Sequence, residues 1–465
     1  MDIVSQCNEI YLQMVRQAGG APGPISRTGA MLHIAMFEVI NALAPAGVPT
    51  YETYLNPIAC IPGPDALQRL SAIYAARHIL MTVSGDAHLV PGAKRFEIQT
   101  NLDASFGTLL NDEGGSNVQH TASKDFGECI AQAMINSRQS DGYDNATTYP
   151  GSATPGQWRP TQPGTSGVTP KWGLLHPFGQ WSPNKKFRPS LPAGFETMSE
   201  MLASPEYAAQ LNEVKLLGSS DSTHRTAEQT QIGFFWANDL DGTSKPPGQL
   251  YTMTSIIAQQ RNLTLEESAR LFALAGMAMA DAAIVAWDVK YETGIDLWRP
   301  ESAVREANSD GNTHTGADPF WQPLSRTAPQ RGMTSTPGQV MSETSVTRFS
   351  PPFPAYVSGH ATFGAAHAAA MRVALGTDNI TFTLTTEDPN AVGVTRTFNS
   401  LMAAALENGR SRVYLGVHFQ WDGDNGFLAG TKVGKFVATN FFKQLNPPPV
   451  PMLITESPDT AVTES

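Results

Sequence analysis

The chain has 465 residues, enough to bury a large core and, as a rough prior, about two to four domains' worth of length. Its net charge of −11 at pH 7 provides no overall positive field, so neither nucleic acid nor an anionic membrane is expected as a partner. Any anion that the protein binds must therefore be held by a local group of cations.

The three cysteines, Cys7, Cys60 and Cys129, form no CxxC pair and no recognisable disulfide framework. This usage fits a reducing compartment. The first residues also lack the basic start and apolar run of a signal peptide. We therefore expect a soluble protein that is cytoplasmic rather than secreted.

The first third of the chain has the periodicity of helices. In residues 26–43, apolar side chains recur at a spacing of three and four, which is typical of one buried helix face. The same spacing predicts helices over 7–17, 65–83, 93–109 and 117–137. Residues 1–140 are thus expected to form an N-terminal helical region.

The next segment, residues 141–195, is rich in proline, glycine, serine and threonine but contains Trp158, Trp172 and Trp181. Disorder is one interpretation of this composition. Because disordered linkers are poor in tryptophan, we instead predict a segment that wraps over the helices and packs against them.

One apolar run, residues 271–289, is long enough to suggest a membrane span. Asp281 and Asp288 would be costly in lipid, so a buried core helix is predicted. Thr264 and Glu267 form a capping box that marks where this helix begins, and the pattern extends to about residue 290.

The remaining chain also favours helices, and residues 196–445 are expected to form a helical bundle followed by a flexible tail at 446–465. Residues 298–324 and 325–350 are read as loops, and only residues 380–385 alternate as a strand would. The predicted class is therefore all-α, with helical bundles joined by long Pro/Gly-rich loops. Helices are predicted over 207–217, 226–238, 250–261, 361–375, 397–408 and 424–442.

The segment Ser358-Gly359-His360 follows a proline-rich run and precedes an alanine-rich helix. Ser358 is a good N-cap, and the free N–H groups and positive dipole end of a helix start suit a tetrahedral oxyanion. An ordinary helix cap with an incidental histidine is the alternative. His367, further along the helix, is expected to be a packed histidine.

Two other segments carry cations. Lys290 and Arg299 supply a point charge and a fork that can hold two oxygens. Arg412 is followed six residues later by His418, a candidate nucleophile or ligand, and Asp422 could hold the other ring nitrogen. Alternatively, Lys290 simply ends its helix and His418 packs in the core. The Arg-Pro pair also recurs at Arg159 and Arg188, in the wrapping segment.

In chain order, Lys290…Arg299-Pro300, Ser358-Gly359-His360 and Ser411-Arg412-x5-His418-x3-Asp422 closely resemble the three-part signature of the vanadium-dependent haloperoxidases and the related type 2 phosphatidic acid phosphatases. The stretches Gln157-Trp-Arg-Pro, Phe235-Trp-Ala and Trp321-Gln-Pro-Leu resemble soluble bacterial-type members. The resemblance covers roughly residues 25–440 and implies an all-helical fold with two four-helix bundles.

The resemblance implies vanadate as cofactor and a role for each matching residue. His418 would bind the metal, with Asp422 behind it, and His360 would be the acid–base group. Trp287 and Phe353 match pocket positions of the chlorinating enzymes, although the halide is not fixed by them. The oxygens of the anion would be held by Lys290, Arg299, Arg412, Ser358 and Gly359.

The sequence departs from the family pattern in three places. Eight residues rather than the usual six separate Lys290 from Arg299, so the intervening turn must bulge. Val357 stands where proline is usual. The loop at 325–350 is longer than its counterparts, which leaves the mouth of the pocket unpredicted.

The function expected from these motifs is that of a vanadate-dependent haloperoxidase, which acts on hydrogen peroxide and halide. A small organic halogen acceptor is compatible with this function. The resemblance alone implies a homodimer. One alternative is a soluble acid phosphatase in which His418 becomes a phosphohistidine. Another is a non-catalytic helical scaffold.

Overall fold

The computed structural model describes residues 1–55, 59–161, 164–181, 186–326 and 350–445. The predicted tail and most of the predicted 325–350 loop lie outside these residues. The described chain is mainly helical, which confirms the predicted class, and it also contains two small antiparallel sheets.

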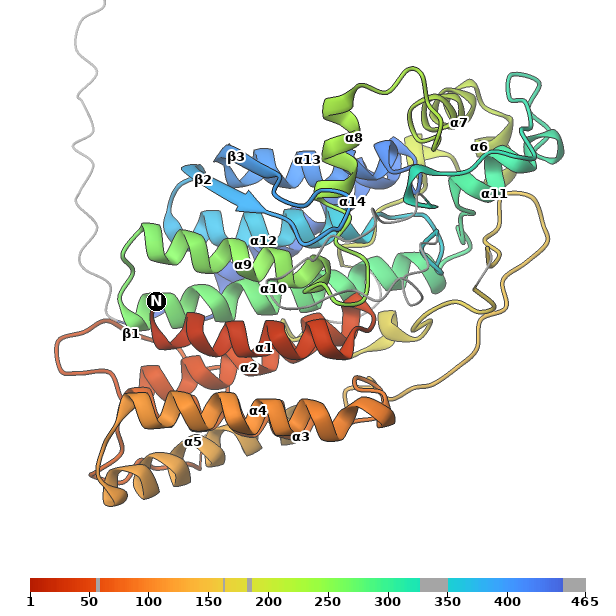
Figure 1. The fold of residues 1–465 in the computed structure, drawn as a ribbon. Helices are drawn as coiled ribbons and strands as arrows, with labels where there is room; N and C mark the ends of the chain where they lie inside the picture. The colour runs from red at the N-terminus through yellow and green to blue at the C-terminus, as the bar shows by residue number, and fades with distance from the viewer. Residues whose placement is uncertain (56–58, 162–163, 182–185, 327–349, 446–465) are drawn as a thin grey trace, which may run out of the picture.

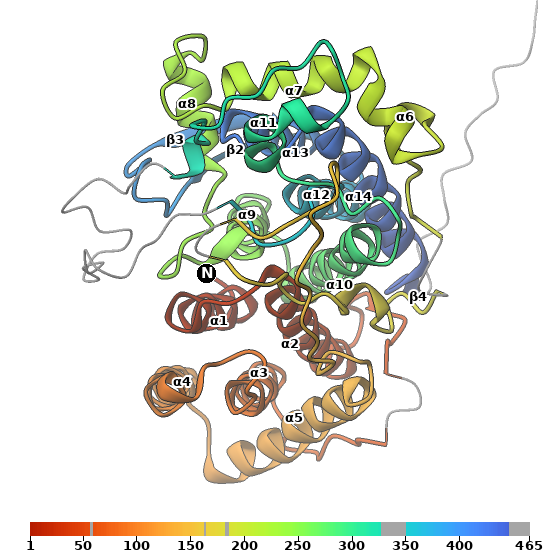
Figure 2. The same ribbon diagram turned by 90° about the vertical axis from the view of Figure 1, so that its right-hand side faces the viewer.

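The N-terminal helices gather at one end of the molecule (Figures 1 and 2). Helix α2 (Pro22–Ala42) is buried along almost its whole length. It packs between α3 (Gln68–Ser84) and α5 (Asn117–Arg138) on one side and the long helix α10 (Leu265–Tyr291) on the other. Helix α1 (Ile3–Ala18) lies beside α2, and α4 (Gly92–Glu113) lies beside α3.

The segment 141–195 packs against this framework, as its tryptophans predict, and the disordered interpretation is wrong for its described part. Trp158, Trp172 and Trp181 are 1%, 4% and 7% exposed. Arg188 binds the carboxylate of Asp288 on α10 through two hydrogen bonds of 2.6 Å. The segment therefore covers α10 from outside.

Helix α10 is the central helix of the molecule. Thr264 and Glu267 form the predicted capping box, with hydrogen bonds of 3.2 and 2.9 Å between side chain and backbone. Among the described residues this is the one helix long and apolar enough to cross a membrane, yet 94% of its most apolar window is buried inside the protein. Asp281 fits there because it accepts two backbone N–H groups of the wrapping segment. The predicted core helix is confirmed.

A second group of helices surrounds the other side of α10 (Figure 2). Helix α12 (Gly359–Leu375) packs against α10, α13 (Leu401–Tyr414) and α14 (Gln420–Asn440), while α9 (Lys245–Gln260) lies alongside. Smaller elements cover one end of the group, namely α6 (Met198–Ala203), α7 (Pro205–Leu217), α8 (Ala227–Phe235), α11 (Pro300–Arg305), β2 (Asn379–Thr385) and β3 (Thr395–Ser400).

Helix α14 approaches α12 through a line of glycines. Gly426, Gly430 and Gly434 recur every four residues, and an added Cβ would lie 2.8, 2.2 and 2.1 Å from backbone oxygens of α12. The two backbones can come this close only because no side chain separates them. This contact brings the N-terminal ends of both helices together.

Several short elements were not predicted, among them α6, α11 and β3. Helices α6 and α11 span six residues each, too short for a periodic pattern. A helix was expected to begin at residue 397, but residues 397–400 belong to strand β3. This strand pairs with β2, with Phe398 opposite Phe382. Helix α13 starts only after Ser400, whose Oγ accepts the Ala403 N–H at 3.0 Å.

The structure also corrects the interpretation of the cysteines. Cys60 and Cys129 form a disulfide across 69 residues of sequence, and Cys7 is free and buried. Single cysteines in separate segments carry no spacing pattern that would reveal such a pair. Cysteine usage therefore gives no support to a reducing compartment. A cytoplasmic location stays a prediction that the cysteines do not support.

We expect Gly430→Ala to lower the free energy of unfolding by about 1–3 kcal/mol, because the new Cβ would meet a backbone oxygen that can move only with α12. Gly107→Ala in α4 is the matched control, since nothing lies within 4 Å of its added Cβ. That variant should gain up to about 1 kcal/mol from helix propensity. Denaturant unfolding measures the free energy of unfolding of both variants. Equal changes in Gly430→Ala and Gly107→Ala would contradict the close contact between α12 and α14.

We expect Cys60→Ser with Cys129→Ser to destabilise the protein by about 2–4 kcal/mol, because the unfolded chain loses a long closed loop. Thermal or denaturant unfolding with and without reductant measures the change. The reductant should lower the stability of the unmodified protein and leave the double variant unaffected. Unchanged stability in both would show that the pair is not bonded.

Candidate oxyanion site

The start of α12 is fastened to the start of α14. The N–H of Ser358 donates to the carbonyl of Asp422 at 2.9 Å. Ser358 caps α12 as predicted, its Oγ accepting the third N–H of the helix at 3.4 Å. The Tyr356–Val357 peptide bond just before it is cis. The N–H groups of Gly359 and His360 have no carbonyl partner within the helix, which leaves them available to an oxyanion.

His418 lies between an arginine and a carboxylate. Its Nε2 is 2.9 Å from Nη1 of Arg299, and its Nδ1 is 2.9 Å from Oδ2 of Asp422. Because a guanidinium can only donate, Nε2 must be the unprotonated nitrogen and Nδ1 must donate to Asp422. Nε2 thus directs its lone pair at the cations, as a metal ligand or nucleophile requires.

The surroundings keep this imidazole neutral. Burial lowers the pKa of His418 well below its ordinary value, and the charges of Arg299 and Lys290 lower it further. Burial raises the pKa of Asp422 to about 7, although Lys290 opposes that shift. A histidine must be unprotonated to bind a metal, so the pocket favours the ligand form.

Arg299 and Arg412 carry the unused hydrogen-bond donors of the site. Arg299 donates to the carbonyls of Phe353 and Val417 at 2.7 and 2.8 Å, and Arg412 donates to Asp239 at 2.9 Å. Nη2 of Arg299 and both Nε and Nη1 of Arg412 are buried without a partner among the described residues. Buried donors are nearly always satisfied. These three groups therefore fit an anion with several oxygens, such as vanadate.

Lys290 is buried and directs its ammonium at the segment leading into α12. Its Nζ donates to the carbonyls of Pro354, Ala355 and Val357 at 2.6, 3.0 and 2.6 Å. Burial, and then the charge of Arg299, lower its pKa well below the ordinary value. An ammonium has three donors, so an oxygen of a bound anion would have to replace one of these carbonyls. Direct contact with the anion stays a prediction for Lys290.

The turn after Lys290 takes up the two additional residues. Helix α10 ends at Tyr291, Asp296 has a left-handed φ of 35°, and Leu297 bridges to Gln157 of the wrapping segment. Arg299 then stands at the N-cap of α11. This detour returns its guanidinium to His418 despite the longer spacing.

His360 lies at the border between the buried cations and solvent. Its Nε2 is 3.2 Å from the carbonyl of Ala237 and 3.7 Å from Oδ1 of Asp239. Because a carbonyl only accepts, Nε2 carries the proton and Nδ1 is free to accept one. Burial, and then Arg412, lower the pKa of His360 to about 4 against the opposing charge of Asp239. The ring is therefore neutral at pH 7.

Asp239 is the site residue that the sequence analysis missed. It lies in the loop between α8 and α9, where its carboxylate faces both Arg412 and His360. Burial raises its pKa, but the charges of Arg412 and His360 outweigh this effect and lower it overall. Lys245 holds the loop by donating to the Asp239 carbonyl at 2.7 Å. Asp239 follows the Phe235-Trp-Ala stretch, but a single loop carboxylate has no pattern of its own.

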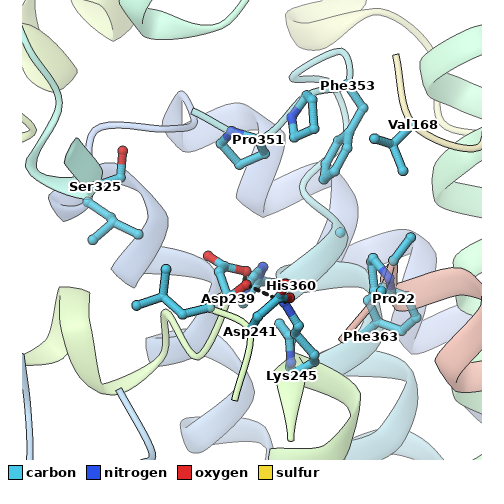
Figure 3. Close-up of a pocket in the computed structure, with 17 residues that line it drawn as sticks. Pro22, Val168, Asp239, Asp241, Lys245, Ser325, Pro351, Phe353, His360 and Phe363 are labelled. Carbon is cyan, nitrogen blue, oxygen red and sulfur yellow. Dashed lines mark hydrogen bonds and ion pairs between the residues drawn. The ribbon is translucent and has the colours of Figure 1, made fainter. Parts of the chain in front are cut away.

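A cavity of about 460 Å³ opens beside the start of α12 (Figure 3). Gly359 and His360 form part of its wall, and Figure 3 shows Asp239 and Lys245 grouped beside His360. Phe353 lines the cavity, whereas Trp287 is fully buried behind it, with ring centroids 4.9 Å apart. Of the two predicted pocket residues, only Phe353 therefore faces the open space.

Other candidates from the sequence lie elsewhere. Nε2 of His367 is 2.8 Å from Oγ1 of Thr254, so this histidine is packed as predicted. Arg159 pairs with Glu306 at 2.7 Å and Arg188 pairs with Asp288. Among the three Arg-Pro pairs, Arg299 is the one that contacts His418.

Known proteins resemble this chain in fold and, to a lesser degree, in sequence. Residues 270–447 match the family described as the VCPO second helical-bundle domain. The chain is 29% identical to the vanadium chloroperoxidase of Curvularia inaequalis over 512 aligned residues, covering 89% of this chain and 78% of that protein.

Solved structures of bacterial enzymes superpose on the chain. A bacterial vanadium-dependent iodoperoxidase has a TM-score of 0.75 at 23% identity, with 96% of this chain and 99% of that one covered. A holo-type bacterial vanadium-dependent chloroperoxidase has a TM-score of 0.61 at 16% identity, with 91% and 93% covered.

Fold and site together define a helical-bundle protein with a buried, cationic oxyanion site and a neutral histidine facing it. All the signature residues lie within the 270–447 match. Residues 270–447 thus match the second helical-bundle domain of the vanadium chloroperoxidases, and the chain as a whole is similar in sequence to a vanadium chloroperoxidase and in fold to the bacterial vanadium-dependent enzymes.

We expect Asp422→Asn to weaken oxyanion binding by about 10–100-fold, because an amide no longer enforces the proton on Nδ1 of His418. Calorimetric titration with orthophosphate as the probe measures the affinity. Asp424→Asn is the matched control, since it removes the same charge from an exposed position two residues away. Equal affinities in the two variants would remove Asp422 from the site.

Proposed function

We propose that this protein is a vanadate-dependent haloperoxidase that oxidises a halide with hydrogen peroxide. In the net reaction, halide, peroxide and one proton give hypohalous acid, or an equivalent halogenating species, and water. The observation that carries the proposal is the set of three guanidinium nitrogens on Arg299 and Arg412 that have no partner among the described residues, beside the unprotonated Nε2 of His418.

The charges of the site favour a bound oxyanion. Lys290, Arg299 and Arg412 are almost fully buried, and only the carboxylates of Asp239 and Asp422 offset them among the described residues of the site. A buried charge without a partner is costly, so an anion completes the cluster. The cations also reduce the repulsion that an approaching halide would meet.

Each residue has a task in this assignment. His418 would hold the vanadium through Nε2, oriented by Asp422, while Arg299, Arg412 and the N–H of Gly359 would hold oxygens. Bound vanadate supplies a Lewis acid that activates peroxide toward halide attack. Lys290 fixes the backbone of the segment before α12 and adds its charge.

His360 is the group placed to move protons. Its Nδ1 is unprotonated and its ring borders the cavity, so it can take a proton from an entering peroxide and return it to the departing oxygen. Asp239 positions this ring and orients Arg412 at the same time. Homodimer formation stays a prediction.

The test is halide oxidation by the protein incubated with orthovanadate, hydrogen peroxide and iodide, bromide or chloride in separate reactions. We expect turnover that depends on vanadate, measured as tri-iodide formation or bromination of an acceptor dye. A chromogenic phosphate ester is tested in parallel without vanadate. Phosphate ester hydrolysis without vanadate-dependent halide oxidation would falsify the proposal in favour of an acid phosphatase.

We expect His418→Ala to abolish vanadate-dependent turnover while the protein keeps its helical circular dichroism and melting temperature within a few degrees. The exposed His224→Ala is the control and should retain full activity. Activity retained by His418→Ala would assign the metal to another ligand.

A further inference from the structure

The cavity beside His360 is far larger than the established reactants of a haloperoxidase require. We propose that it binds an uncharged, electron-rich aromatic molecule, and that this molecule is halogenated there. The halogenation step rests on the proposed function. The evidence for the binding site is the cavity itself and does not depend on that function.

The cavity is large enough to hold a small organic molecule. It measures about 460 Å³. A water molecule takes up about 30 Å³, and a halide with one peroxide needs only a few times that space. Cavities that bind small organic ligands measure roughly 300–1,000 Å³. This cavity falls within that range.

The lining of the cavity is largely apolar. Rings and branched side chains from separate parts of the chain face the open space, which suits a flat apolar ligand better than a hydrated ion. Figure 3 shows Pro22 and Phe363 on one side and Pro351, Phe353 and Val168 on another. The apolar wall comprises Pro22, Val168, Leu240, Pro246, Pro351, Pro352, Phe353, Phe363 and Leu415.

The charged groups of the cavity wall disfavour a charged ligand once an oxyanion occupies the free donors of Arg299 and Arg412. Asp239 is paired with Arg412 at 2.9 Å, and Asp241 is paired with Lys245 at 2.8 Å. With the oxyanion in place, a ligand carboxylate or ammonium would have to compete with one of these pairs for a partner among the described residues. An uncharged molecule enters without that cost.

The position of the cavity links binding to chemistry. Gly359 and His360 belong to both the cavity wall and the oxyanion site, and Phe363 follows on the next turn of α12. A ring held against Phe363 therefore lies next to the place where hypohalous acid is formed. In the step itself, a carbon–halogen bond replaces a carbon–hydrogen bond, and the displaced ring proton joins the hydroxide of hypohalous acid to give water.

Val168 offers a way to fill the cavity without touching the oxyanion site. Figure 3 shows its side chain directed at the open space from the wrapping segment. We expect Val168→Phe to occupy part of that space. Val118→Phe is the matched control, because Val118 is 61% exposed on α5.

The first experiment measures binding with the protein saturated with orthophosphate, which occupies the free donors of Arg299 and Arg412. We expect 2-naphthol to bind saturably with one-to-one stoichiometry in calorimetry, and 2-naphthoate to bind at least about tenfold more weakly. Val168→Phe should weaken 2-naphthol binding by roughly tenfold, and Val118→Phe should not change it. Absence of saturable 2-naphthol binding, or equal binding of the anion, would overturn the aromatic site.

The second experiment uses the vanadate-loaded enzyme with peroxide and bromide. Free 2-naphthol competes with the same phenol attached to a polymer that cannot enter the cavity. We expect the enzyme to brominate the free phenol several-fold more selectively than reagent hypobromite does, and Val168→Phe to lose this selectivity while its tri-iodide rate stays within about twofold. If Val168→Phe does not fold, the comparison between the unmodified enzyme and reagent hypobromite still tests the proposal.

The outcomes separate the two proposals. Normal halide oxidation with the product ratio of reagent hypobromite would show that halogenation occurs in solution, which overturns the inference and leaves the proposed function intact. Absence of halide oxidation with intact 2-naphthol binding would refute the proposed function and the halogenation step, while the aromatic site would stand.

Discussion

The close contact between α12 and α14 determines where the rest of the site lies. Gly430 and its neighbouring glycines let the two backbones meet, and the hydrogen bond from Ser358 to the Asp422 carbonyl joins the two N-terminal ends. Because His360 lies in the first turn of α12 and His418 immediately precedes α14, this packing places both histidines at one point. Side chains in place of these glycines would separate them.

The second constraint is the positive charge that the bundle buries. A chain with a net charge of −11 concentrates three cations at this one place. Burial, partly offset by the charge of Asp422, lowers the pKa of Arg299 to about 9. Carbonyls satisfy Lys290 and part of Arg299, and a carboxylate satisfies one edge of Arg412. Nη2 of Arg299 and both Nε and Nη1 of Arg412 have no partner in the part of the chain that the structure describes. The fold thus holds a site whose hydrogen bonds are completed by an anion.

The site has an inner and an outer part, and His360 belongs to both. The inner part is the buried group around His418, which is polar and suited to an oxyanion. The outer part is the apolar cavity, in which Phe353 and Phe363 face the open space. The loop that carries Asp239, held by Lys245, contacts both parts, because the Asp239 carboxylate pairs with Arg412 and faces the His360 ring at the cavity wall. A proton carrier at this border can serve reactants that arrive through the cavity and react at the anion.

The sequence by itself determined the features that depend on residues close to one another along the chain. Helical periodicity, the capping box at Thr264 and the Ser358 cap follow from local spacing, and the order of the charged motifs indicated the family. Only the tertiary structure decided which distant groups meet. Asp239 and Arg412 are 173 residues apart, the disulfide spans 69, and the carbonyls that engage Lys290 come from a segment more than sixty residues away. Such contacts are set by how helices pack, because side-chain partners across a core leave no periodic trace along the chain.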